Sequence, residues 1–227
     1  MHLSSSMRLR WFIVNYLHPT LINATHKMRV LDVGSGDING SYKCMFDPNF
    51  FEYTGLDIEE GPNVDIVVKP YDWHTIETDS YDVVISGQAF EHSEFFWVTM
   101  SEMTRVLKKN GLLCVIVPNA CPEHRYPVDC YRFYTDGMVA LARYNCLSIL
   151  HAHTNCYSLK ETEGTREEWC PFTKEKVGTE AGLIDSILVA RKPYEGETKI
   201  VNLNEYKCSP IDHNILRGDL RQAEWLH

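Results

Sequence analysis

Apolar residues occur along this chain in two alternating patterns, continuous runs and runs at helical spacing. A continuous run bounded by glycine, proline or polar residues is typical of a buried strand, and apolar residues three and four apart are typical of an amphipathic helix. Strands that alternate with helices predict a mostly parallel, doubly wound α/β sheet. The predicted strands are 28–33, 50–58, 63–69, 80–92 (ending in a loop), 111–119, 146–154 and 183–193, and the predicted helices are 4–17, 41–46 and 94–108.

The first helix, 4–17, has a cap candidate at each of Ser4, Ser5 and Ser6. Pro19 is expected to end it, because proline disfavours the helical conformation in the residue before it. The helix is predicted to pack on the sheet edge, which is favoured over the alternative of a lid above the cofactor.

The first strand runs into a glycine-rich turn, and residues 28–42 read MRVLDVGSGDINGSY. Gly34 and Gly36 let the backbone approach a ligand closely, so the turn with Ser35 predicts a phosphate or nucleoside site. Asp32, inside the strand, would repel a pyrophosphate but accept hydrogen bonds from an ammonium group. This favours S-adenosylmethionine over NAD. The alternative is a tight turn without a ligand.

The second strand ends in an acid, Asp57, followed by Ile58. Asp57 lies 21 positions after Gly36, a spacing at which a strand-end carboxylate accepts both ribose hydroxyls of a nucleoside. The alternative is a surface acid at a strand end, but the pairing with the glycine turn favours the ligand role.

Two more segments are predicted to reach the same sheet edge. The loop 70–73 carries an acid between aromatic rings, which suits an adenine and its exocyclic amine; these residues are Tyr71, Asp72 and Trp73. Trp73 is equally suited to the core. Gly87 and Gln88 end the fourth strand, where open α/β sheets bind their ligands.

Length and composition predict one substantial domain over residues 1–193, with a lead-in at 1–27, a polar loop excursion at 155–182 and an irregular tail at 194–227. Whether the tail wraps the domain or meets a second subunit in a homodimer is left open. A net charge of −9 without a basic stripe argues against a nucleic-acid partner. No apolar run is long enough for a membrane span. The eight cysteines include no Cys-x-x-Cys pair, which favours reduced thiols and a cytoplasmic location.

The segment 123–138, EHRYPVDCYRFYTDGM, follows the fifth strand, where an acceptor would meet the cofactor. His124 is the candidate general base, and Arg125 and Arg132 are candidates to clamp an anion. Other candidates for acceptor contact are Tyr126, Asp129, Tyr131, Tyr134 and His92. The alternative is a surface loop pinned by Arg–Asp pairs and tyrosine packing, with Thr135 or Asp136 capping the next helix. His151 and His153 share a strand face without a third metal ligand and are predicted to be packed or surface residues.

Four segments between 29 and 119 resemble class I S-adenosylmethionine-dependent methyltransferases of the type 11 branch: VLDVGSG, YTGLDI, SYDVVISGQAFEH and RVLKKNGLLCVIVPN. The resemblance implies a three-layer Rossmann-like fold with seven strands in the order 3-2-1-4-5-7-6, the last antiparallel. It implies that Asp32 and 34–36 hold the methionine end, Asp57 the ribose and 71–73 the adenine. One departure is Ile38, where the family often has a third glycine, which affects the path of the following helix.

The pattern RYPVDCYRFY looks like methyltransferases of capsule and surface-polysaccharide modification. The expected function is methyl transfer to a hydroxyl, phosphate or amine of a small, anionic acceptor. No metal is expected, because a sulfonium needs no Lewis acid when a side chain positions and deprotonates the nucleophile. The alternatives are an NAD-dependent oxidoreductase, which would want a third glycine and a Tyr-x-x-x-Lys pair, and a cofactor-binding partner without catalysis.

Overall fold

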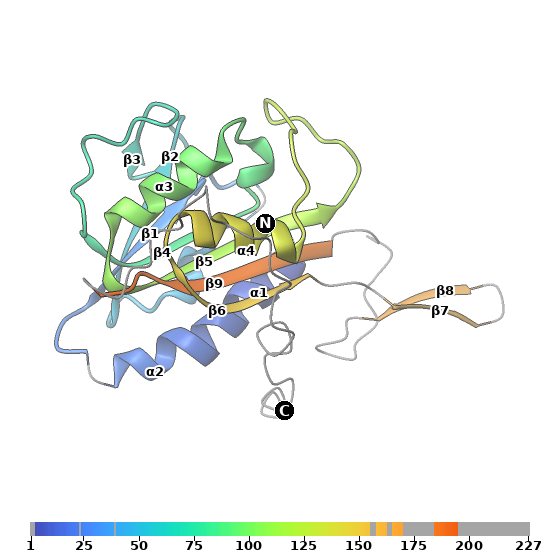
Figure 1. The fold of residues 1–227 in the computed structure, drawn as a ribbon, viewed down its shortest axis with the longest axis horizontal. Helices are drawn as coiled ribbons and strands as arrows, with labels where there is room; N and C mark the ends of the chain where they lie inside the picture. Colours follow the sequence, from blue (N-terminus) through green and yellow to red (C-terminus); the bar gives the residue numbers. More distant parts are fainter. Residues whose placement is uncertain are drawn as a thin grey trace, which may run out of the picture.

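The computed structural model describes residues 3–22, 24–38, 40–154, 158–162, 165–169 and 184–194. In this part of the chain a seven-stranded sheet has the order β3-β2-β1-β4-β5-β9-β6 (Figure 1). The strands are β1 (Met28–Val33), β2 (Phe51–Asp57), β3 (Ile66–Val67), β4 (Tyr81–Gly87), β5 (Leu107–Ala120), β6 (Ser148–Thr154) and β9 (Ile184–Arg191).

The predicted topology is confirmed. Strands β1 to β5 pair in parallel, and β9, the last strand of the sheet in sequence, pairs antiparallel with both β5 and β6. Because β1 to β5 point the same way, their carboxyl ends meet at one edge of the sheet. That edge is where the glycine turn after β1 and the acid at the end of β2 come together.

Helices cover both faces of the sheet (Figure 1). On one face lie α3 (Phe96–Val106) and α4 (Thr135–Tyr144), which bury Met100, Met103 and Met138 against the sheet. On the other lie α1 (Leu3–Phe12), the π-helical turn η1 (Ile13–Leu17) and α2 (His18–Leu21). Phe12 and Leu17 are fully buried there. The N-terminal segment therefore packs on a face of the sheet, and not at the sheet edge where the sequence analysis placed it.

The N-terminal helix departs from the sequence prediction at both ends. Pro19 does not end it, because the π-helical turn comes first and Pro19 falls in the first turn of α2, where a missing N–H is tolerated. Ser4 and Ser5 do not cap it, since both lie inside α1. Their hydroxyls instead contact Asp185 and Tyr42.

Other boundaries shift for local reasons. The predicted strand 63–69 is shorter in the structure, Ile66–Val67, and just before it the Asp65 carboxylate accepts a hydrogen bond from the Gly55 N–H. Strand β5 begins at Leu107, and its pairing with β4 contains an irregularity where a stop was predicted at 109–111. Residues 41–46 contain a 3-10 helix, η2 (Tyr42–Met45).

The loop predicted at 155–182 contains a hairpin of β7 (Ser158–Thr162) and β8 (Thr165–Trp169), so that prediction is wrong for these residues. The antiparallel ladder satisfies backbone groups that a loop would leave to water. The rest of the excursion, and the tail beyond residue 194, lie outside the described residues. The predicted domain limits stay a prediction. In the described part, no helix is both long and apolar enough to cross a membrane.

Candidate active site

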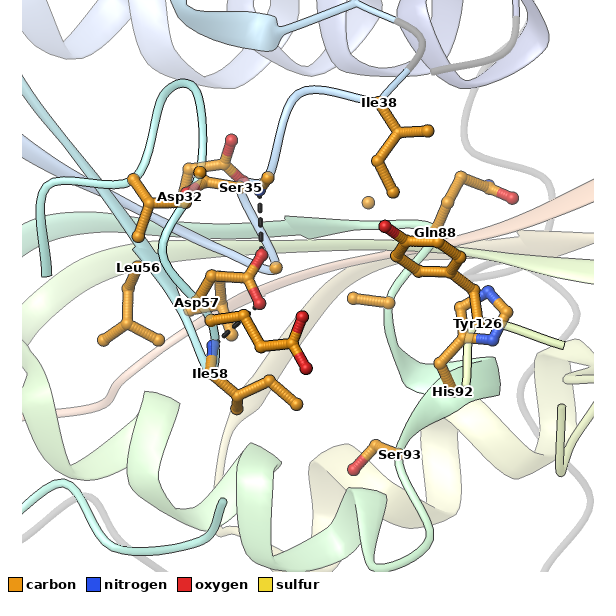
Figure 2. A pocket seen from close by; sticks show the side chains of 18 of the residues that line it. Asp32, Ser35, Ile38, Leu56, Asp57, Ile58, Gln88, His92, Ser93 and Tyr126 are labelled. Atoms are coloured by element: carbon orange, nitrogen blue, oxygen red, sulfur yellow. Dashed lines mark hydrogen bonds between the residues drawn. The ribbon is translucent and has the colours of Figure 1, made fainter. Parts of the chain in front are cut away.

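A cavity of about 640 Å³ opens at the carboxyl ends of β1, β2 and β4. Figure 2 shows Asp57 and Ile58 on one side of it and His92 and Tyr126 on the other. Every predicted cofactor residue except Asp72 lines this cavity: Asp32, Gly34, Ser35, Gly36, Asp57, Ile58, Tyr71, Trp73, Gly87 and Gln88. A volume of this size is within the range of small-molecule sites.

The turn after β1 requires glycine at position 34 and is tight at position 36. Gly34 has a φ of +77°, and a Cβ there would lie 2.5 Å from the Cβ of Ala89. A Cβ on Gly36 would lie 3.0 Å from the Asp57 Oδ2 atom. Ser35 fixes the turn, because its hydroxyl donates a hydrogen bond to the Asn63 carbonyl at 3.0 Å. The backbone therefore approaches the cavity closely, with Ile38 at its mouth (Figure 2).

Asp57 is held against this turn by the backbone. Its Oδ2 atom accepts a hydrogen bond from the Gly36 N–H at 2.8 Å, and its Oδ1 atom accepts one from the Ile58 N–H at 2.7 Å (Figure 2). A carboxylate oxygen has two acceptor positions, so both oxygens keep a free one. Asp57 thus presents a fixed pair of acceptors to the cavity.

Asp32 is the buried acid of the site. Only 2% of it is exposed. Its Oδ2 atom accepts a hydrogen bond from the Tyr53 hydroxyl, and its Oδ1 atom has no partner in the described part of the chain. Burial raises the pKa of Asp32 to about 7, with a smaller contribution from the charge of Asp57 and an opposing one from the Tyr53 hydrogen bond. The unpaired buried oxygen is suited to a cationic donor.

The loop after β3 supplies only part of what the sequence predicts. Trp73 is a buried wall residue, and the Tyr71 ring packs on Phe95 with ring centroids 5.2 Å apart. Asp72 does not line the cavity; its carboxylate lies 2.7 Å from the exposed His74 ring, which lowers its pKa. The structure therefore does not bring Asp72 to the cavity, and its contact with an adenine stays a prediction.

Hydrogen bonds connect the end of β4 to β9 and, through β9, to α1. The sequence does not reveal these contacts. Gln88 donates a hydrogen bond to Asp185 on β9 at 2.9 Å, and the same carboxylate accepts one from Ser4 on α1 at 2.6 Å. Gly87 lies directly against Tyr42. A Cβ at this position would lie 2.1 Å from the Tyr42 hydroxyl oxygen, so a larger residue would not fit. The cavity floor is therefore fixed by residues remote in sequence.

Four predicted acceptor residues line the opposite wall: His92, His124, Arg125 and Tyr126. The His92 and His124 rings are nearly perpendicular, with centroids 5.0 Å apart. Between β4 and this wall lies Glu91, a fully buried cavity residue that the sequence analysis did not single out. Burial raises the pKa of Glu91 to about 8. The one feature of the sequence that could have pointed to Glu91 is its position directly before His92, a candidate acceptor residue.

Arg132 and Asp129 hold the loop and do not line the cavity. The Arg132 guanidinium donates to both Asp129 carboxylate oxygens, at 2.5 and 2.8 Å. Asp129 also accepts a hydrogen bond from the His124 N–H at 2.7 Å. The guanidinium keeps the pKa of Asp129 well below its ordinary value. The Nη1 and Nη2 atoms of Arg132 are thus occupied by Asp129 and by backbone carbonyls, and the predicted anion clamp by Arg132 stays a prediction that this arrangement does not favour.

Tyr131, Tyr134 and the predicted caps of α4 lie outside the cavity. The Tyr131 ring packs on Phe96, with centroids 4.9 Å apart, and its hydroxyl donates to the Glu94 carbonyl at 3.0 Å. Tyr134 precedes α4 with 62% of its surface exposed, outside the cavity. No side chain caps α4, because Thr135 pairs with Thr154 instead.

Of the remaining candidates, His151 is packed, as predicted. It is 5% exposed and its ring centroid lies 4.7 Å from that of Trp11. Burial lowers its pKa to about 4. The cysteines of the described part are free thiols, in agreement with the absence of a disulfide pattern.

Comparisons with known proteins agree with this geometry. Residues 31–115 match the Methyltransf_11 family model, described as a methyltransferase domain. The chain matches no curated protein sequence at a significant level. Solved structures with the same fold include the 1,6-didemethyltoxoflavin-N1-methyltransferase of Burkholderia thailandensis, bound to 1,6-didemethyltoxoflavin and S-adenosylhomocysteine (TM-score 0.57, 14% identity, 84% of this chain and 79% of that one).

Two others are a SAM-dependent methyltransferase of Archaeoglobus fulgidus (TM-score 0.54, 17% identity, 83% of this chain and 95% of that one) and the YcgJ protein of Bacillus subtilis (TM-score 0.55, 14% identity, 85% and 100%). At these identities the likeness shows the fold. Fold and family match together define the class of protein: an S-adenosylmethionine-dependent methyltransferase. More particularly, residues 31–115, which run from β1 into β5, match the model of the type 11 methyltransferase domain, and the sequence motifs that resemble this family lie in and around that segment.

Proposed function

We propose that this chain methylates an oxygen or nitrogen of a small, anionic acceptor. S-adenosylmethionine would lie in the half of the cavity between Asp32 and Asp57, and the acceptor would lie against His92, His124 and Arg125. The observation that carries the proposal is the unpaired, buried Oδ1 atom of Asp32, at the floor of the cavity that Asp57 also lines.

The residues present fit the cofactor. The free oxygen of Asp32 suits the ammonium group of the methionine end, and the glycine turn leaves room beside it. Asp57 keeps acceptor positions for the ribose hydroxyls. Leu56, Val68 and Trp73 add apolar wall for the adenine. When bound, the cofactor supplies an electrophilic methyl group on a sulfonium.

The opposite wall favours an anionic acceptor. Arg125 is the single arginine or lysine among the cavity residues that the structure describes. Its Nε atom lies 2.8 Å from Glu123, but both side chains are largely exposed, and an exposed pair contributes little free energy. Arg125 is therefore free to exchange Glu123 for a phosphate or carboxylate of the acceptor.

We assign the removal of the acceptor's proton to His124, one of the two histidines in this wall. The His124 Nδ1 atom lies 3.1 Å from the Pro122 carbonyl, which assigns the ring proton to Nδ1 and leaves Nε2 with a lone pair. Imidazole suits proton transfer near neutral pH. The RYPVDCYRFY pattern suggests a surface-polysaccharide precursor as the acceptor, and this identity is part of the proposal.

Titration calorimetry with S-adenosylhomocysteine and with NAD tests the cofactor assignment. We expect micromolar binding of the first and none of the second. Asp57→Ala should weaken S-adenosylhomocysteine binding by about 1.5–3 kcal/mol, the range for a lost hydrogen bond to a charged group. Asp72→Ala is the matched control and should leave the affinity unchanged, because Asp72 does not line the cavity. Equal affinity in the parent and Asp57→Ala would remove Asp57 from the site.

A further inference from the structure

Glu91, His92 and His124 bring three metal-binding atoms to one point of the cavity wall. One ligand atom from each lies within 4.8 Å of the others, and the Glu91 Oε1 atom is 3.8 Å from the His92 Nε2 atom. Glu91 is fully buried, yet neither of its carboxylate oxygens has a hydrogen-bond partner in the described part of the chain. A buried carboxyl group without a hydrogen-bond partner is costly, so the position of Glu91 in the cavity wall suits the binding of a cation.

The two histidines are oriented as metal-bound histidines usually are. A metal-binding imidazole generally donates its second ring N–H to a carbonyl or carboxylate, which fixes the tautomer and the ring. The His92 Nδ1 atom lies 2.6 Å from the Val128 carbonyl. The His124 Nδ1 atom lies 3.1 Å from the Pro122 carbonyl and 3.6 Å from Asp129. Both rings therefore keep Nε2 as a lone-pair donor.

We propose that Glu91, His92 and His124 bind one divalent first-row transition cation, such as Zn²⁺, Mn²⁺ or Fe²⁺, with an open position facing the cavity. Two imidazoles and one carboxylate on one side of a cation favour these ions over Mg²⁺ and Ca²⁺, which prefer oxygen ligands alone. In a tetrahedral site with bonds of about 2.0–2.1 Å, neighbouring ligand atoms lie roughly 3.3 Å apart. Rotation of the half-exposed His124 ring shortens the present separation.

The use of this cation deepens the proposed function and rests on it. A hydroxyl oxygen of the acceptor would occupy the open position, where a bound cation lowers the pKa of the hydroxyl, so that its proton would pass to solvent water before the oxygen takes the methyl group. His124 would then act as a ligand and not as a solitary base. This proposal differs from the expectation from the sequence, which is that methyl transfer proceeds without a metal ion.

The site is tested with the metal ion alone. The full chain is stripped with EDTA, dialysed and titrated with Zn²⁺ by calorimetry, and separately with Co²⁺, whose visible absorption reports nitrogen and oxygen ligands. We expect one saturable site in the parent. Loss of an outer-shell partner alone typically weakens metal binding ~10–100-fold, so Glu91→Gln and His92→Gln should lose at least that much. His74→Gln, which changes an exposed histidine outside the cavity, should bind as the parent does.

Two further measurements separate a failed site from a failed fold or a failed cofactor assignment. Thermal unfolding of metal-free Glu91→Gln shows whether the variant folds, and S-adenosylhomocysteine titration of the metal-free parent tests the proposed function independently. Zn²⁺ affinity that is equal in the parent, Glu91→Gln and His92→Gln overturns the metal site, even where S-adenosylhomocysteine binds. A Zn²⁺ site lost in both variants supports it, even where S-adenosylhomocysteine fails to bind.

Discussion

Asp32→Asn is expected to stabilise the ligand-free protein above pH 7 and to weaken its cofactor complex. Burial raises the pKa of Asp32 from an ordinary 3.8 to about 7 in the folded protein. The folded state therefore holds this proton more tightly than the unfolded chain. The stability that follows is complete below about pH 4 and is lost as the pH rises through 7. Asparagine never ionises, so the variant lacks this loss.

The magnitude follows from the size of the shift. Each pKa unit corresponds to about 1.4 kcal/mol, and we expect the variant to exceed the parent by about 2–4 kcal/mol in free energy of unfolding at pH 8. Urea unfolding of both proteins between pH 4 and 8 measures this. Curves that fall in parallel across that range would contradict the raised pKa of Asp32.

Cofactor binding should change in the opposite direction. The ammonium group of S-adenosylhomocysteine would pair with an ionised Asp32, so the affinity of the parent should rise between pH 5 and 8. Asp32→Asn should bind about 1.5–3 kcal/mol more weakly at pH 8, the value of a charged hydrogen bond, and with little pH dependence. Calorimetry at several pH values tests both statements, and Asp72→Ala again serves as the control variant.

The sheet and the cofactor side of the cavity follow from the sequence because parallel topology does most of the positioning. Once 28–33 and 50–58 are neighbouring parallel strands, the residues after each strand must meet at one edge. Asp57 and Gly36 therefore come within hydrogen-bond distance across 21 positions without any further information. The direction of the parallel strands places these residues, and the positions of the strands in the sequence are sufficient to predict it.

The acceptor side does not follow, because there the direction of single side chains decides. Arg125 and Arg132 are equivalent candidates in the sequence, yet one lines the cavity and the other is occupied by Asp129. Asp72 adjoins Trp73, but only the tryptophan faces inward. Glu91 is missed because a glutamate next to a loop is ordinarily a solvated residue. Such burial depends on contacts that a linear pattern does not encode.

Arg132→Ala is expected to destabilise the protein, and Arg125→Ala is not. The Asp129 side chain is 2% exposed and that of Arg132 is 22% exposed. Removing Arg132 leaves a buried carboxylate without its cation, and breaking a buried ion pair costs about 3–5 kcal/mol. Because Arg132 keeps some exposure, we expect about 3 kcal/mol. Each kcal/mol lowers Tm by about 2–4 °C in a protein of this size, so Tm should fall by about 6–12 °C.

Arg125→Ala is the matched control because it removes the same side chain from the same loop. The Arg125 and Glu123 side chains are 75% and 64% exposed, so we expect a Tm within about 2 °C of the parent, as for most surface substitutions. S-adenosylhomocysteine affinity should be unchanged in Arg125→Ala, which would act on the acceptor alone. A stable Arg132→Ala variant would contradict the structural role of the Arg132–Asp129 pair and return Arg132 to the candidates for acceptor binding. The loop that carries His124 would then have to be held by Tyr131 and its contact with the Glu94 carbonyl.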